Sequence, residues 1–186
     1  MALTLPPEEI QLLALNECID FANKAHEEIG RYRINMMLAP EQIQSKEFCV
    51  PTLEWQSIKY GSDAVDQVPD NKCGVYAFVL CEKSSILPPH GYVLYIGIAG
   101  RNSKRSLRAR YKDYLNTKTV VKTRPRIAYM IGNWHKLLHF YFVPVEDNFS
   151  STELQTLEKQ LNTALMPPFS IGDLEAKISK KRRAFQ

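Results

Sequence analysis

The chain has 186 residues, 45% of them apolar, which is enough for one folded domain with an extension. No apolar run approaches bilayer-spanning length and the N-terminus has no signal-peptide pattern, so we expect a soluble, cytoplasmic protein without a membrane partner. The four cysteines are widely spaced and lack metal-ligand spacing, which argues against a zinc site and favours reduced thiols.

The positive charge of the chain is concentrated in two stretches. Residues 101–126 hold ten of the 24 Lys and Arg residues against one acid, Asp113, and residues 177–186 hold five more without an acid. A charge run is usually a solvated face, but here the rest of the chain is acidic. Each contact between a basic side chain and a phosphate releases counterions. The sequence therefore predicts a polyanion-binding surface around residues 101–126.

The first part of the chain is predicted to be mostly helical. Apolar residues at helical spacing predict an amphipathic helix over 8–29, and Gly30 is a plausible stop. A second short helix is predicted over 40–46. We assign residues 1–68 to an N-terminal extension, and two roles stay open for it: a packing cap, or a specificity or dimerisation module.

Residues 69–172 read as one compact domain, followed by a basic tail over 173–186. The pattern of apolar and polar residues within 69–172 predicts strands, helices and one basic loop. The strands are expected at 74–80, 92–98 and 137–145, the helices at 103–116, 125–131 and 150–165, and the loop at 116–122. This order predicts an α/β fold, an α+β sandwich in which a small antiparallel sheet of about three strands is flanked by helices.

Four motifs in this domain resemble those of the GIY-YIG nuclease superfamily. They are Gly74-Val75-Tyr76, Tyr95-Ile96-Gly97, the helical Leu107-Arg108-x-Arg110-x-x-x-Tyr114, and Leu157-Glu158 followed by Pro167. The resemblance covers about residues 69–171 and implies a GIY-YIG-like fold. The chain departs from the family at Ser170, where an Asn is usual, and in longer loops between the motifs, which also occur in the family's restriction enzymes.

The resemblance implies a metal-dependent DNA endonuclease that hydrolyses phosphodiester bonds, with a restriction-like role as the first choice. It implies that Tyr76 is the general base, supported by Tyr95, and that Tyr114 contacts the phosphate or orients the water. Arg110 would oppose the charge that develops on the phosphate, because a guanidinium fork suits two oxygens. Glu158 would hold one Mg²⁺ or Mn²⁺, which tolerates a single protein carboxylate.

The physical chemistry of a phenol sets one condition on this scheme. A tyrosine has a pKa near 10 and is a poor base at neutral pH. We therefore expect the guanidinium of Arg110 and the metal ion to lower the pKa of Tyr76.

Five basic residues are predicted to contact the DNA backbone, which positions an enzyme without reading sequence. They are Arg101, Lys104, Arg105, Arg108 and Lys112. The expected target is double-stranded DNA, and a homodimer would let one site per chain cut both strands.

Two alternative functions stay open. One is a catalytically weak or inactive nucleic-acid-binding module of the same fold, motivated by Ser170 and the acidic extension. The other is an interaction protein whose tail over 180–183 is only a solubilising or targeting patch.

Overall fold

A computed structural model describes residues 7–37, 40–44, 48, 50–82, 90–100, 105–146, 149–170 and 180, with side chains from residue 16 onward except at 40 and 42. The chain divides into two units, Met1–Asn35 and Met36–Gln186. The first unit holds α1 (Pro7–Glu28), which confirms the helix predicted over 8–29, and the 3₁₀ turn η1 (Gly30–Tyr32). Within the described ranges, none of the helices combines the length and apolarity that crossing a bilayer requires.

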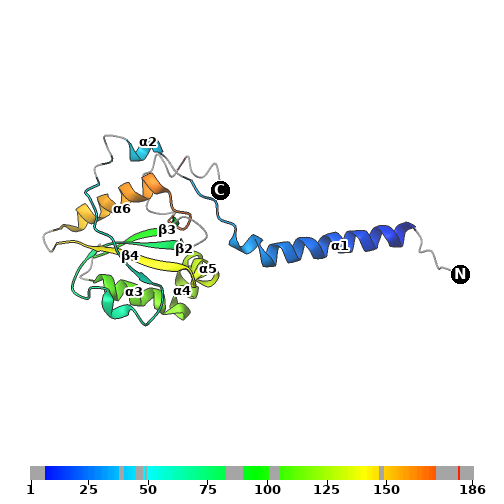
Figure 1. Ribbon diagram of the computed structural model, residues 1–186, viewed down its shortest axis with the longest axis horizontal. Coiled ribbons are helices and arrows are strands. Elements are labelled where there is room, and N and C mark those ends of the chain that lie inside the picture. Colours follow the sequence, from blue (N-terminus) through cyan, green and yellow to red (C-terminus); the bar gives the residue numbers. More distant parts are fainter. Residues whose placement is uncertain are drawn as a thin grey trace. The chain divides into compact units, whose positions relative to one another are not determined.

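The second unit is a four-stranded antiparallel sheet with helices on both faces (Figure 1). The strand order is β1-β4-β2-β3. The elements are α2 (Pro40–Ile43), β1 (Gln56–Lys59), η2 (Val65–Gln67), β2 (Gly74–Glu82), β3 (His90–Ala99), α3 (Leu107–Leu115), α4 (Thr117–Thr123), α5 (Pro125–Trp134), β4 (Leu138–Pro144) and α6 (Ser151–Leu165). This arrangement is consistent with the predicted α+β class.

The prediction of three strands is wrong, because β1 adds a fourth strand beside β4. Ser57 pairs with Tyr141 and Ile58 pairs with Phe140. In β1 only Ile58 is buried, so the segment lacks the alternating apolar pattern by which the other strands were recognised. The structural boundary after Asn35 also differs from the predicted boundary after residue 68, since the intervening residues belong to the unit that holds the sheet.

Two predicted features around the basic stretch also differ from the structure. The loop expected over 116–122 is largely the helix α4, which the side chain of Asn116 caps by accepting a hydrogen bond from the backbone of Thr119. The helix expected from residue 103 begins at Leu107, because the hydroxyl of Ser106 accepts the backbone N–H of Ala109 and so caps α3. The expected cap Ser103 lies outside the described residues.

Different helices cover the two faces of the sheet. Side chains of successive strand residues point to opposite faces. Val75 and Ala77 of β2 belong to an apolar cluster with Leu154 of α6. Tyr76, which lies between them in sequence, packs against the ring of Tyr114 of α3. Thus α6 covers one face, and α3 lies on the other (Figure 1).

A β-bulge in β3 decides which face Tyr95 occupies. Phe78 of β2 pairs with Tyr95, but the next residue of β2 pairs with Val93 and leaves Leu94 as an extra residue. Val93 packs against the cluster on the α6 face. Without the bulge, residues 93 and 95 would share that face, since strand side chains alternate. The bulge therefore turns Tyr95 to the face on which the Tyr76 ring lies.

The segment after α6 runs along the outer edge of β3 to the opposite face of the sheet. The backbone N–H of Phe169 donates to the carbonyl of Leu94 at 3.0 Å. The hydroxyl of Ser170 accepts from the N–H of Ile96 at 2.9 Å and donates to its carbonyl at 3.2 Å. The ring of Phe169 lies 6.0 Å from that of Trp134 in α5. These contacts tie α6 to the far side of the sheet.

Candidate active site

The three tyrosines of the sequence motifs meet on the face of the sheet that α3 covers. The hydroxyls of Tyr76 and Tyr114 are hydrogen-bonded at 2.7 Å, and the two side chains are 1% and 0% exposed. The ring of Tyr95 lies 6.2 Å from that of Tyr76 and 6.4 Å from that of Tyr114. Residues from β2, β3 and α3 thus form one aromatic cluster with a pair of linked hydroxyls.

Gly97, the glycine of the second motif, is where β3 approaches the Tyr76 ring most closely. A Cβ atom at this position would lie 2.6 Å from the Tyr76 hydroxyl oxygen and 2.7 Å from Cζ. These distances are shorter than side chains tolerate, so a larger residue would displace the phenol. The glycine therefore fixes the position of the hydroxyl that Tyr114 contacts.

Arg124 joins this cluster, although no motif of the sequence pointed to it. Its Nη1 donates to the hydroxyl oxygen of Tyr114 at 2.8 Å, and its Cζ lies 5.2 Å from the centre of that ring. Burial lowers the pKa of Arg124, but the hydroxyls of Tyr114, Tyr76 and Tyr95 outweigh this and raise it above its ordinary value. Arg124 therefore stays a cation. Its only sequence signal is its place in the basic stretch, just before Pro125.

Arg110 reaches the cluster from α3. Its charge acts on Tyr76, where it favours the ionised phenol. Its Nη1 lies 3.6 Å from Oδ2 of Asp113, one turn along the helix. Its Nε is buried and has no hydrogen-bond partner within the described part of the chain. A buried donor without a partner costs about 1–3 kcal/mol, so a bound acceptor would relieve this cost.

A cavity of about 240 Å³ opens beside these groups, between α3 and α4. Most of its lining residues have polar side chains, with three guanidinium groups against one carboxylate. The lining residues are Arg105, Arg110, Asp113, Tyr114, Asn116, Thr119, Val120, Thr123 and Arg124. An excess of positive charge inside a small cavity favours an anionic ligand.

The pKa of Tyr76 runs against the expectation for a ready general base. Burial is the largest effect and raises the pKa well above its ordinary value, and the neighbouring hydroxyls of Tyr114 and Tyr95 raise it further. Arg110 lowers it, as predicted, but does not offset the burial. In the protein alone, Tyr76 therefore holds its proton at neutral pH.

Glu158 lies on α6, whose apolar residues pack against the face of the sheet opposite the tyrosine cluster. Its side chain is 5% exposed. One turn on, Asn162 is fully buried, and neither its Oδ1 nor its Nδ2 has a hydrogen-bond partner among the described residues. Carboxylate and amide oxygens are ligands that Mg²⁺ accepts, so this pair fits a divalent ion in its chemistry. The described residues contain no group of three or more His, Cys, Asp or Glu that could hold a metal.

The five predicted DNA contacts fare differently. Lys112 is exposed, and Arg105 pairs with Asp113 at the rim of the cavity. Arg108 is instead engaged within the fold, because its Nε donates to the carbonyl of Val68 at 2.7 Å and its Nη2 to that of Asp66 at 2.9 Å. The other two, Arg101 and Lys104, lie outside the described residues.

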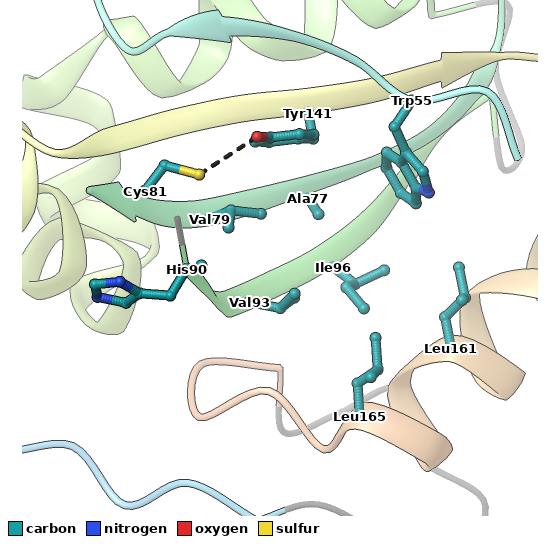
Figure 2. A pocket seen from close by; sticks show the side chains of 11 residues that line it. Trp55, Ala77, Val79, Cys81, His90, Val93, Ile96, Tyr141, Leu161 and Leu165 are labelled. Carbon is teal, nitrogen blue, oxygen red and sulfur yellow. Dashed lines mark hydrogen bonds between the residues drawn. The ribbon is translucent and has the colours of Figure 1, made fainter. Parts of the chain in front are cut away.

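A second cavity, of about 510 Å³, lies on the α6 face and has a different character (Figure 2). Apolar side chains such as Val93, Leu161 and Leu165 dominate its wall, and no Lys or Arg is among its lining residues. Cys81 and Tyr141 also line this cavity, and the Cys81 sulfur is hydrogen-bonded to the Tyr141 hydroxyl at 3.3 Å. This cavity does not suit a phosphate, so the candidate site is the polar one.

Comparison with protein families, with curated proteins and with solved structures finds no match for this chain. The resemblance to the GIY-YIG nucleases therefore stands on the four sequence motifs.

Proposed function

We propose that this protein is a metal-dependent DNA endonuclease of the GIY-YIG type that hydrolyses phosphodiester bonds. The observation that carries the proposal is that Tyr76 of the first motif is hydrogen-bonded to Tyr114 of the helical motif, and that Tyr114 and Arg110 line a cationic cavity. A cleft that pairs hydroxyls with guanidinium groups is the kind of site in which charge on a phosphate is stabilised.

Each protein group has a definite task in this scheme. Arg110 and Arg124 oppose negative charge on the phosphate, and Arg124 also donates to the oxygen of Tyr114. Tyr114 passes a proton to or from Tyr76 across their hydrogen bond, since Tyr76 itself is enclosed. Glu158 would hold a Mg²⁺ or Mn²⁺ ion, and that ion would supply Lewis-acid chemistry.

Double-stranded DNA is the proposed substrate because the cavity lies within the basic stretch of the chain. Exposed Lys112 on α3 and the basic residues of α4 flank it, and they would contact backbone phosphates on either side. A restriction-like role and a homodimer that cuts both strands remain parts of the same proposal.

Plasmid cleavage in Mg²⁺ tests this function. We expect the parent protein to nick or cut plasmid, and Glu158→Gln to lower the rate by about 100-fold or more, as for loss of a metal ligand or its support. Glu146→Gln is the matched control, since Glu146 is an exposed carboxylate close to the same helix. Cleavage by Glu158→Gln at the parent rate, or no cleavage by the parent in Mg²⁺ or Mn²⁺, would refute the proposal.

A second candidate is a nucleic-acid-binding module of the same fold that does not cut. Three observations favour it: the raised pKa of Tyr76, the burial of Glu158, and Ser170 in place of Asn. Salt-dependent DNA binding in EDTA, together with intact plasmid under every metal tried, would select this candidate over the nuclease.

A further inference from the structure

The polar cavity between α3 and α4 is lined by Arg124, a residue that none of the sequence motifs assigns to the site. We propose that it is a phosphate-binding subsite in which Arg124 and Arg110 grip one phosphate group directly, without a metal ion. The inference rests on the proposed function only in taking the phosphate to be part of a nucleic acid.

The first argument is the position of Arg124. It comes from the α4–α5 junction, whereas Arg110 comes from α3, so two separate elements bring guanidinium groups to one cavity. A guanidinium carries five N–H donors in a fixed fork. One N–H of Arg124 is committed to Tyr114. That bond holds the guanidinium in place at the wall of the cavity.

The second argument is the unsatisfied donor of Arg110. Its Nε is buried without a hydrogen-bond partner among the described residues, although Nη1 of the same guanidinium forms an ion pair with Asp113. An acceptor with several oxygens, such as a phosphate, would satisfy this donor. A neutral ligand would leave the excess of positive charge in the cavity unopposed.

The third argument is the size of the cavity. At about 240 Å³ it is smaller than the pockets of roughly 300–1,000 Å³ that enclose drug-sized ligands. It therefore suits a phosphate and its immediate waters rather than a whole nucleotide. The same chemistry would serve a phosphodiester inside a strand or a terminal phosphomonoester.

The test measures the binding of inorganic phosphate to the full chain in EDTA. Broadening of the phosphorus NMR line of the phosphate reports the binding. We expect Arg124→Gln to weaken binding by roughly tenfold or more, because a hydrogen bond to a charged group is lost. Arg126→Gln is the matched control, since Arg126 is exposed two residues away and does not line the cavity. Equal weakening in both variants, or none in Arg124→Gln, would overturn the subsite.

A second variant guards against misfolding of the first. If Arg124→Gln loses its cooperative thermal transition, Arg110→Gln is measured in its place, and it too should weaken phosphate binding by roughly tenfold. Parent-like binding by a folded Arg110→Gln would equally overturn the subsite. Competition by a short oligonucleotide with and without a 5′-phosphate then separates the two sources. A preference for the phosphorylated form identifies the terminal group, and equal competition identifies the internal one.

Cleavage, measured separately in Mg²⁺, distinguishes the two proposals. If the parent cuts DNA while Arg124→Gln binds phosphate like the parent, the subsite is wrong and the nuclease stands. If nothing cuts DNA but Arg124→Gln loses phosphate binding while Arg126→Gln keeps it, the nuclease is wrong and the subsite stands.

Discussion

At the scale of single residues, the candidate site depends on contacts between particular side chains, and residue types alone reveal only some of these contacts. Tyr76 and Tyr114 could be predicted, because their motifs are recognisable in the sequence. Arg124 could not, since nothing in the spacing of the chain indicates that it would reach the hydroxyl of Tyr114. The enclosure of Tyr76 was equally hidden, because burial arises from the helices that pack over the strand.

Replacement of Gly97 by alanine should test the contact that positions the Tyr76 hydroxyl. The added Cβ would overlap the phenol oxygen, so we expect a loss of about 1–3 kcal/mol in the free energy of unfolding. Urea denaturation measures it. In the control Gly132→Ala, the new methyl group meets open space in α5, and stability should rise by up to about 1 kcal/mol. Equal effects of the two changes would contradict the overlap.

The raised pKa of Tyr76 predicts how the stability of the protein changes at alkaline pH. A tyrosine whose pKa is raised on folding binds its proton more tightly in the native state, so its contribution is complete below pH 10 or so and is lost as the pH rises further. Urea midpoints for the parent should therefore fall as the pH rises from about 10 to about 11. Tyr76→Phe should show a shallower fall over that range, whereas an unchanged slope would refute the shift.

At the scale of elements, apolar periodicity was a good guide and short polar segments were not. The strands β2, β3 and β4 were predicted because they are rich in β-branched and aromatic residues. The helix α4 was missed because its sequence, TKTVVKT, is poor in helix formers, and a cap and one buried valine hold it instead. β1 was missed because a single apolar residue is no pattern.

Removal of the α4 cap is the corresponding prediction. The side chain of Asn116 accepts the backbone N–H of Thr119, so Asn116→Ala should cost about 1 kcal/mol of stability. Because α4 leads directly into Arg124, the same change should also weaken phosphate binding. Thr117→Ala, at the first exposed position of α4, serves as the control. Chemical denaturation and phosphate titration would show whether α4 needs its cap.

At the scale of the whole molecule, the chain divides into two units after Asn35, whereas the sequence predicts a boundary after residue 68. The segment from residue 36 to residue 68 carries β1 and several hydrogen bonds to α3. The hydroxyl of Tyr60 donates to the carbonyl of Tyr114 at 2.8 Å, and that of Tyr111 donates to the carbonyl of Gly61 at 2.8 Å. This segment therefore supports the helix that carries Arg110.

Two truncations separate the boundaries. A chain that starts at Met36 keeps every strand of the sheet, so we expect its thermal unfolding to remain cooperative with a midpoint close to that of the parent. A chain that starts at Pro69 loses β1 and these hydrogen bonds to α3, and should be markedly less stable. Loss of the cooperative transition in the longer chain would place the first unit within the folding unit of the sheet.

The two rims of the sheet differ in what they offer to another polypeptide. At the β3 rim, Phe169 and Ser170 occupy the carbonyl of Leu94 and both backbone groups of Ile96. At the other rim, β1 is the terminal strand among the residues that the structure describes. Augmentation of the sheet by a foreign strand would thus be directed to β1, where the charge of Lys59 discourages indiscriminate association. At the β3 rim, the hydroxyl of Ser170 thus occupies backbone groups with which another strand would have to pair.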